Sequence, residues 1–283
     1  MSRLRDWVAG GPLVTDGAWG TEMQKRGLAP GVCPDCWNLE HPERVEAVAE
    51  AYCDAGSSVI LTNTFRANPV SLPDLDVSAI NRAGVEISRR AARGRARVAA
   101  SIGPSGKLLA SGDITSEALA EAFSVQARAL ADAGPDVLLL ETMSDPEEAR
   151  IALRAALATG LPVIVSFVFD TGRAHDRTMT GATPEVVAEA MRSDGADAVG
   201  ANCGVGVDGF ADVCRRLSAA SGLPVWIKPN AGLPTLENGA IAYPGSPERF
   251  AASVPEWTAA GASFIGGCCG SSPAFIKALR ACV

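Results

Sequence analysis

The sequence predicts a single α/β domain with the (β/α)8 TIM-barrel fold over residues 1–283. Short runs rich in Val, Ile and Leu alternate with longer amphipathic stretches, as buried parallel strands alternate with helices. Eight such pairs fit into 283 residues, a usual size for this barrel. A doubly wound open sheet is the alternative, but no Gly-x-Gly-x-x-Gly or Walker loop follows the first strand.

Each predicted strand is followed by polar residues or glycines. The first run, which begins at Leu13, leads into Asp16 and Gly17, and the last leads into two glycines and two cysteines. The predicted strands are 13–15, 59–62, 97–102, 137–140, 163–169, 198–201, 225–227 and 263–265. Because the C-terminal ends of barrel strands open into one mouth, we expect the residues that follow them to form the active site.

The segments between these strands carry helix signals. Asp145 and Thr183 are predicted N-caps followed by Pro, and Gly134 and Gly195 mark helix ends. The predicted helices are 43–53, 116–133, 146–159, 184–192, 210–220, 247–260 and 273–282. The Arg-rich stretch 89–97 is interpreted as the end of a helix, and Pro255 is expected to break its helix near the middle.

Composition narrows the class of protein. Hydrophobic residues make up 47% and charged residues 20% of the chain, which is enough for a large buried core. A net charge of −7 argues against nucleic acid or a membrane surface as partner. The N-terminus has no signal-peptide pattern, and no apolar run approaches the roughly 20 residues that span a bilayer. We therefore expect a cytoplasmic protein whose eight cysteines are thiols or metal ligands.

Three cysteines follow predicted strands among glycines. Cys203 follows the sixth strand, and Cys268 and Cys269 follow the eighth, so the barrel would bring their sulfurs together. Three Cys ligands with an open fourth position are typical of a catalytic zinc site. Zinc held in this way can deprotonate an incoming thiol and leave it a strong nucleophile. The alternatives are small buried side chains or a vicinal redox pair.

The remaining cysteines and the histidines have simpler interpretations. Cys53, Cys214 and Cys282 lie on predicted helices and are expected to be core thiols. For the Cys33-Pro-Asp-Cys36 segment, three interpretations stay open: incidental loop cysteines, a role in access to the active site, or a redox pair. The only histidines, His41 and His175, are expected on the surface or in loops.

Seven motifs occur in order and together resemble the homocysteine S-methyltransferase family, including the homocysteine-binding module of cobalamin-dependent methionine synthase. The resemblance runs over essentially the whole chain. The motifs are Asp16-Gly-Ala-Trp-Gly-Thr21, Thr62-Asn-Thr-Phe65, Ser101-Ile-Gly-Pro104, Glu141-Thr-Met-Ser-Asp145, Gly200-Ala-Asn-Cys203, Lys228-Pro-Asn-Ala-Gly232 and Gly266-Gly-Cys-Cys-Gly270.

The resemblance implies a (β/α)8 barrel that binds Zn²⁺ through three cysteines and takes homocysteine as substrate. The matching zinc ligands are Cys203, Cys268 and Cys269, and the matching acidic residues that would face the substrate's ammonium group are Asp16 and Glu141. Backbone N–H groups of the turn formed by Gly17, Ala18, Trp19, Gly20 and Thr21 would bind its carboxylate.

Three asparagines complete the predicted site. Asn230 is a candidate fourth zinc ligand when substrate is absent, or else a turn residue before Gly232. Asn63 and Asn202 are expected to line the mouth or to brace its loops. Trp19 departs from the family, in which smaller or more flexible residues are usual, and would narrow the mouth, contact a cationic donor or pack in the wall.

The sequence thus predicts a zinc-dependent S-methyltransferase that methylates homocysteine to methionine by in-line displacement, without a protein nucleophile. We find no cobalamin-binding or folate-binding module in the chain, so the methyl donor is expected to be separate. Candidate donors are a corrinoid protein, S-methylmethionine, S-adenosylmethionine and betaine. Two alternatives remain: methylation of another small thiol, and a non-catalytic thiol- or zinc-binding module that serves a corrinoid partner.

Overall fold

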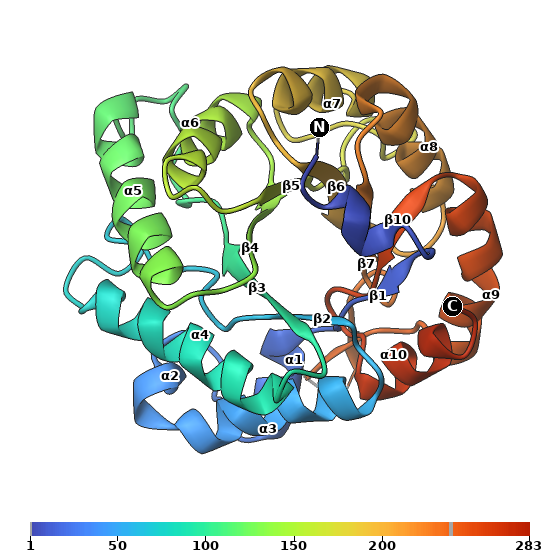
Figure 1. Ribbon diagram of the computed structural model, residues 1–283, viewed down its shortest axis with the longest axis horizontal. Helices are drawn as coiled ribbons and strands as arrows, with labels where there is room; N and C mark the ends of the chain where they lie inside the picture. Colours follow the sequence, from blue (N-terminus) through green and yellow to red (C-terminus); the bar gives the residue numbers. More distant parts are fainter. Residues whose placement is uncertain (1, 238–239) are drawn as a thin grey trace.

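Eight parallel strands form a barrel in the computed structural model, which describes residues 2–237 and 240–283. The strand order is β1-β10-β7-β6-β5-β4-β3-β2, and a parallel bridge between Thr15 and Val59 joins β1 to β2 and closes the barrel. Helices surround the strands on the outside (Figure 1). The predicted (β/α)8 fold is confirmed.

The strands lie where the sequence predicts them. The barrel strands are β1 Leu13–Val14, β2 Val59–Leu61, β3 Arg97–Ile102, β4 Val137–Met143, β5 Val163–Phe167, β6 Ala198–Cys203, β7 Val225–Pro229 and β10 Ala262–Ile265. β4, β6 and β7 each extend at least two residues beyond the predicted ends. Glu141, Cys203 and Lys228 therefore lie on strands, which fixes their positions more firmly than loops would.

The helices confirm the seven predicted segments and add others. They are η1 Arg5–Val8, α1 Trp19–Lys25, α2 Trp37–Glu40, α3 Pro42–Asp54, α4 Val77–Ala92, α5 Ser116–Asp132, α6 Pro146–Leu157, α7 Pro184–Ser193, α8 Phe210–Ser221, α9 Pro247–Ala259 and α10 Pro273–Arg280. The predicted N-caps are confirmed, since Asp145 accepts a hydrogen bond from Glu147 N at 2.9 Å and Thr183 accepts one from Val186 N at 3.3 Å.

Of helix α4 the sequence predicted only the Arg-rich end, where the helix closes with Arg93 in the left-handed conformation. Gly84 weakens the helical signal in its middle. A Cβ at that position would lie 2.5 Å from Thr64 Cγ2 and 2.8 Å from Asn38 Nδ2. Glycine is therefore needed for the close approach of α4 to the barrel.

The expected break at Pro255 is wrong. Helix α9 runs from Pro247 to Ala259 with Pro255 inside it. Proline removes one backbone hydrogen bond from a helix, but the buried side chains of Phe250, Val254 and Trp257 anchor α9 on both sides of that position. Packing on the barrel thus outweighs the local preference.

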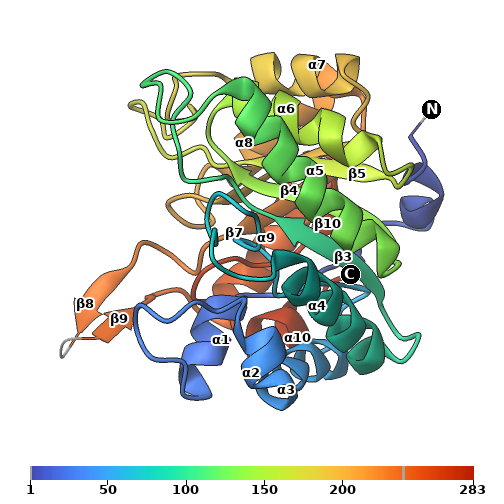
Figure 2. The same ribbon diagram turned by 90° about the vertical axis from the view of Figure 1, so that its left-hand side faces the viewer.

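A short antiparallel hairpin, formed by β8 Thr235–Glu237 and β9 Ala240–Ala242, follows β7 and was not predicted. Figure 2 shows it extending from one end of the barrel, opposite the end that carries the N-terminal segment. The hairpin stands at the C-terminal ends of the strands, where it brings Ile241 and Tyr243 to the mouth of the barrel.

The barrel interior changes from apolar to polar along the strands. The lower part, at the N-terminal ends of the strands, is a cluster in which Leu4 packs against buried strand residues such as Leu139 and Trp226. The upper part lies toward the C-terminal ends of the strands. Side chains alternate between the two faces of a strand, so the next inward position lies two residues further on. At these upper positions stand Asn63, Ser101, Glu141, Ser166, Asn202 and Lys228, all buried.

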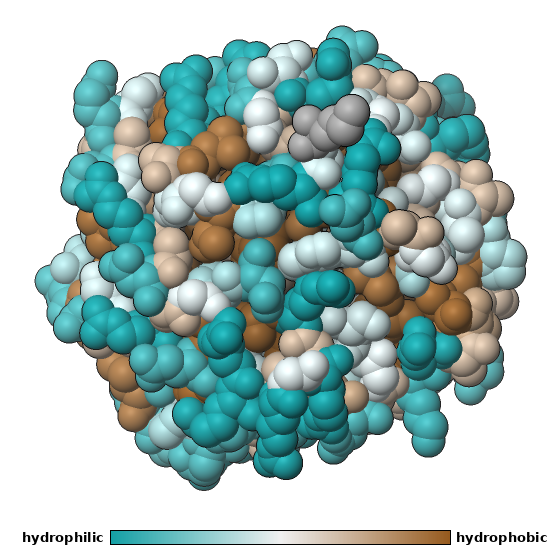
Figure 3. All heavy atoms as spheres, in the orientation of Figure 1, coloured by the Kyte–Doolittle hydropathy of each residue, from teal (hydrophilic) through white to brown (hydrophobic). Residues whose placement is uncertain are grey.

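The larger hydrophobic cluster lies between the strands and the surrounding helices. At the N-terminal end of the barrel, hydrophilic side chains cover much of the surface and hydrophobic ones form scattered patches (Figure 3). Within the described residues, we find no helix with the length and apolar character that crossing a membrane requires.

Candidate active site

The three predicted ligand cysteines meet at the mouth of the barrel. Cys203 is the last residue of β6, and Cys268 and Cys269 follow β10. The Sγ atoms of Cys203 and Cys268 are 3.1 Å apart, and all three sulfurs lie within 4.8 Å of one another. Among the described residues this is the one group of three or more His, Cys, Asp or Glu side chains close enough to share a metal ion.

The end of β7 holds the two cysteine segments together. Cys268 N donates to Pro229 O at 2.8 Å, and Ala231 N donates to Cys269 O at 2.9 Å. Asn230 N donates to Cys203 O at 3.2 Å. Gly266 permits this approach, because a Cβ there would lie 2.0 Å from Thr15 Oγ1.

The cluster has the dimensions and chemistry of a metal site. Tetrahedral zinc with bonds of about 2.3 Å to sulfur places the ligand sulfurs about 3.8 Å apart, which the observed cluster can adopt with small side-chain shifts. The pKa of Cys269 is lowered to about 3, because the thiols of Cys203 and Cys268 and the hydroxyl of Tyr243 donate hydrogen bonds to it. The pKa of Cys203 is raised, because its thiol is a hydrogen-bond donor. The donor set suits a thiophilic divalent ion such as zinc.

Asn202 braces the cluster and does not line the cavity in front of it. Its Oδ1 accepts hydrogen bonds from Thr142 N at 2.9 Å and Ser166 Oγ at 2.6 Å. Its Nδ2 donates to Thr142 Oγ1 at 2.7 Å and lies 3.4 Å from Cys203 Sγ. Thr142 and Cys203 both have positive φ, at 60° and 62°. This network holds the two unusual conformations in place.

Asn230 also braces the cluster in this structure. Its Nδ2 donates to Gly204 O at 2.7 Å, and its Oδ1 accepts from Cys269 N at 3.0 Å. The side chain thus bridges the segments that carry Cys203 and Cys269. Metal ligation by Asn230 would require Oδ1 to leave this hydrogen bond, and that role stays a prediction.

Asp16 is completely buried and its carboxylate is already paired. Its Oδ1 lies 2.5 Å from Lys228 Nζ. Its Oδ2 accepts hydrogen bonds from Trp19 Nε1 and from Leu61 N, both at 2.7 Å. Asp16 is absent from the lining of the cavity, whereas Lys228 is part of it. This ion pair cannot be predicted from the sequence, because its members are 212 residues apart.

Glu141 is the acidic side chain beside the cysteines that does face the cavity. Its carboxylate accepts a hydrogen bond from Ser101 Oγ. Burial raises the pKa of Glu141 to about 7, although Lys228 and Ser101 act in the opposite direction. Glu141 therefore sits where it could meet a cationic group of a ligand.

The cavity in front of the cluster has a volume of about 380 Å³. The predicted residues Gly17, Ala18, Gly20, Thr21, Asn63 and Glu141 line it, as do Cys203, Cys268 and Cys269. Ala18 N donates to Ser271 O at 2.9 Å, so this one N–H group of the predicted carboxylate-binding turn is already engaged. Trp19 also forms part of the wall.

Two loops complete the mouth. Asn63 Nδ2 donates to Pro34 O at 2.7 Å, which ties the Cys33–Cys36 segment to β2. Pro34 and Asp35 line the cavity, so this segment borders the site, and both of its cysteines are free thiols. Tyr243 comes from the unpredicted β8–β9 region and hydrogen-bonds Cys269.

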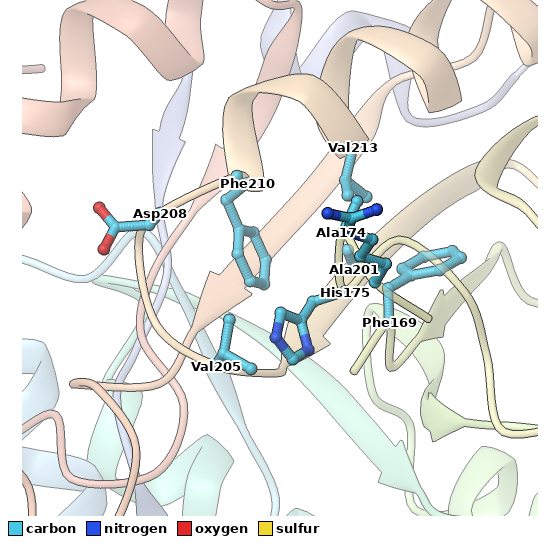
Figure 4. A pocket seen from close by; sticks show the side chains of 10 residues that line it. Phe169, Ala174, His175, Ala201, Val205, Asp208, Phe210 and Val213 are labelled. Carbon is cyan, nitrogen blue, oxygen red and sulfur yellow. The ribbon is translucent and has the colours of Figure 1, made fainter. Parts of the chain in front are cut away.

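A second cavity of about 310 Å³ lies beside β6, between the segment after β5 and the segment that leads into α8. Figure 4 shows the His175 ring beside Phe210 and Val205, with Phe169 on its other side. His175 is exposed and its Nδ1 lies 3.1 Å from Asp170 O. His175 thus lies in a surface loop, as predicted.

Comparison with known proteins agrees with this geometry. The model of the homocysteine S-methyltransferase family matches residues 13–283, and the chain belongs to that family. The methionine synthases of Mycobacterium leprae and Mycobacterium tuberculosis are 30% and 31% identical to it over 99% of its length. The chain spans about a quarter of the length of these relatives, with 25% of each covered.

Solved structures of the homocysteine methyltransferase MmuM from Escherichia coli share the whole fold. The metallated form superposes with a TM-score of 0.82 at 27% identity, covering 98% of this chain and 99% of that one. The oxidised form gives a TM-score of 0.83 over 98% of both chains.

Proposed function

We propose that this protein transfers a methyl group to the sulfur of homocysteine, with zinc held by Cys203, Cys268 and Cys269. One observation carries the proposal: three sulfurs within 4.8 Å of one another face a cavity of about 380 Å³ in a member of this family. Bound zinc would supply Lewis acidity that deprotonates a coordinated thiol at neutral pH. We further propose that the protein works in the cytoplasm, where the ligand thiols stay reduced.

The protein's own groups hold and orient the reactants. Asn202 and Thr142 fix Cys203, and Tyr243 donates a hydrogen bond to Cys269. Glu141 would face the substrate's ammonium group, and backbone N–H groups between Gly17 and Thr21 would face its carboxylate. Methyl transfer then forms a sulfur–carbon bond as the donor–carbon bond breaks, and the bonding electron pair leaves with the donor. Orientation in the cavity provides much of the rate, so no protein nucleophile is required.

A donor screen tests the proposal. Zinc-loaded protein is incubated with homocysteine and, in turn, methylcobalamin, S-methylmethionine, S-adenosylmethionine and betaine, and methionine is measured. We expect one donor to give methionine in many turnovers. If zinc and homocysteine bind but no donor reacts, the protein is a thiol-binding module and the enzymatic proposal fails.

The zinc ligands are tested by replacing one of them. Cys268→Ala removes one of three thiolates, so we expect zinc retention and methionine formation to fall together, each by at least about tenfold. Cys282→Ala is the control, because that thiol lies just after α10 and is exposed, so the prediction that it is a core thiol is wrong. Zinc content is measured on the purified proteins. Full zinc content in Cys268→Ala would refute the ligand assignment.

A further inference from the structure

Lys228 is a buried cation on the wall of the substrate cavity. Its side chain is 2% exposed, and it lines the cavity together with Glu141 and the three cysteines. Burial by itself would lower the pKa of Lys228, but the carboxylates of Asp16 and Glu141 outweigh this effect and raise it. Its Nζ lies 2.5 Å from Asp16 Oδ1, so the ammonium group is the cation of a buried ion pair.

The Lys228 ammonium group has hydrogen-bonding capacity left over. An ammonium group has three N–H donors, and within the described part of the chain Nζ makes one hydrogen bond, to Asp16 Oδ1. A buried donor without a partner is costly. The remaining donors of a cavity-lining cation are therefore suited to the oxygen atoms of an anionic ligand.

Asp16 is poorly placed to receive an ammonium group. Lys228 occupies Oδ1, while Trp19 Nε1 and Leu61 N occupy Oδ2. The charges of Asp16 and Lys228 cancel, and a second ammonium group beside them would be repelled by Lys228. Glu141 lines the cavity beside the cysteines, and Ser101 already donates to it.

We infer that Lys228, together with the backbone N–H groups between Gly17 and Thr21, binds the carboxylate of the thiol acceptor, so that the acceptors are small thiols with a carboxylate. This inference rests on the proposed function and specifies its substrate class. Lys228 thereby acts as a specificity-determining residue. Glu141 would receive the ammonium group of homocysteine, but Ser101 already donates to that carboxylate, so we expect the ammonium group to add less to binding than the carboxylate does.

Three thiol compounds allow the contributions of the substrate's carboxylate and ammonium groups to be measured separately. Homocysteine has both, 4-mercaptobutyrate lacks the amine, and 3-mercaptopropylamine lacks the carboxylate. Binding to zinc-loaded protein is measured by isothermal titration calorimetry. We expect 4-mercaptobutyrate to bind within about threefold of homocysteine. The aminothiol should bind about 10- to 100-fold more weakly, the range that one hydrogen bond to a charged group provides.

Two variants assign the effect to Lys228. Lys228→Met should weaken the two carboxylate-bearing thiols to the level of the aminothiol. Because this change leaves Asp16 buried without its partner, the double variant Asp16→Asn with Lys228→Met removes both charges together and serves as the second test. In either variant that folds and binds zinc, loss of the preference for a carboxylate supports the inference.

The results that would overturn the Lys228 assignment differ from those that would overturn the proposed function. If the aminothiol binds wild-type protein as tightly as homocysteine, the Lys228 assignment is overturned while thiol binding stands. The same holds if the double variant keeps the full preference for a carboxylate. If none of the three thiols binds the zinc-loaded protein, the proposed function fails and the assignment fails with it.

Discussion

The lower and upper halves of the barrel interior are built by the same strands but have opposite requirements. On β4, Leu139 belongs to the apolar lower cluster, and Glu141 stands one inward position above it. On β7, Trp226 and Lys228 have the same relation. Apolar residues need only fill space, whereas each buried polar residue needs a partner of matching chemistry.

The upper half meets this requirement with specific pairs. Lys228 is paired with Asp16, Glu141 with Ser101, and Asn202 with Thr142 and Ser166. Such pairs add little net stability when desolvation is counted, but removing one partner is costly. The lower half therefore stabilises the barrel, while the upper half holds functional groups in fixed positions.

The largest effect is expected from breaking the buried ion pair. Asp16→Asn leaves the Lys228 ammonium without its counter-charge, and we expect a loss of about 3–5 kcal/mol in the free energy of unfolding. The double variant Asp16→Asn with Lys228→Met should regain most of this loss. Urea denaturation of the two variants and the wild type measures both values. A loss below about 1 kcal/mol in Asp16→Asn would show that the pair is screened by water.

The next effect tests the lower half. Leu139→Ala removes a fully buried side chain, and we expect a loss of about 3 kcal/mol from lost burial and the cavity left behind. Zinc content and thiol affinity should stay within about threefold of wild type, because no polar partner of the site is touched. Leu153→Ala, in the outer cluster, is the matched control. A larger loss of thiol affinity in Leu139→Ala than in the control would show that the two halves are coupled.

The sequence predicted the lower half and the cysteine cluster well, for a common reason. Strands buried on both faces form recognisable apolar runs, and parallel strand ends must converge, so Cys203 and Cys268 could be placed together without a structure. The hydrogen bonds and the ion pair among the buried polar residues of the upper half could not be predicted in this way. Lys228 follows a strand like many polar residues, and only the closed barrel shows that it faces Asp16.

The β8–β9 hairpin escaped prediction because its segment contains few of the signals that mark strands. Leu236 and Ile241 are exposed, at 76% and 69%, so burial did not shape the sequence there. Tyr243, which follows the hairpin, could be assigned to the site only from the structure. Helix α4 was largely missed for the opposite reason, since close packing requires a glycine that weakens its pattern.

A smaller effect, dependent on pH, is expected from Glu141→Gln. Burial raises the pKa of Glu141 from 4.5 to about 7 in the folded protein. The folded state therefore holds this proton more tightly than the unfolded state does. Stability from this group is present below pH 4.5 and is lost as the pH rises through 7. The free energy of unfolding of Glu141→Gln minus that of wild type should therefore rise by about 2–3 kcal/mol as the pH is raised from 5 to 8.

Urea denaturation at pH 5 and pH 8 measures this difference. Glu40→Gln is a suitable control, because Glu40 is an exposed carboxylate at the end of α2. A difference between Glu141→Gln and wild type that is the same at both pH values would show that Glu141 ionises normally. That result would make it an ordinary solvated carboxylate and remove the contrast between Glu141 and the apolar residue below it.

The smallest effect is expected from Trp19→Phe, which distinguishes two roles for the one aromatic residue of the first motif. Trp19 Nε1 donates to Asp16 Oδ2 at 2.7 Å, and its ring forms part of the cavity wall. Phe keeps an aromatic ring and removes the donor. Because Leu61 N still donates to the same oxygen, we expect a loss of only about 1 kcal/mol in the free energy of unfolding. Isothermal titration calorimetry measures the affinity of the variant for homocysteine. An affinity within about threefold of wild type would show that the aromatic ring serves only to pack in the cavity wall. A tenfold loss would instead show that the hydrogen bond to Asp16 positions the substrate through Lys228.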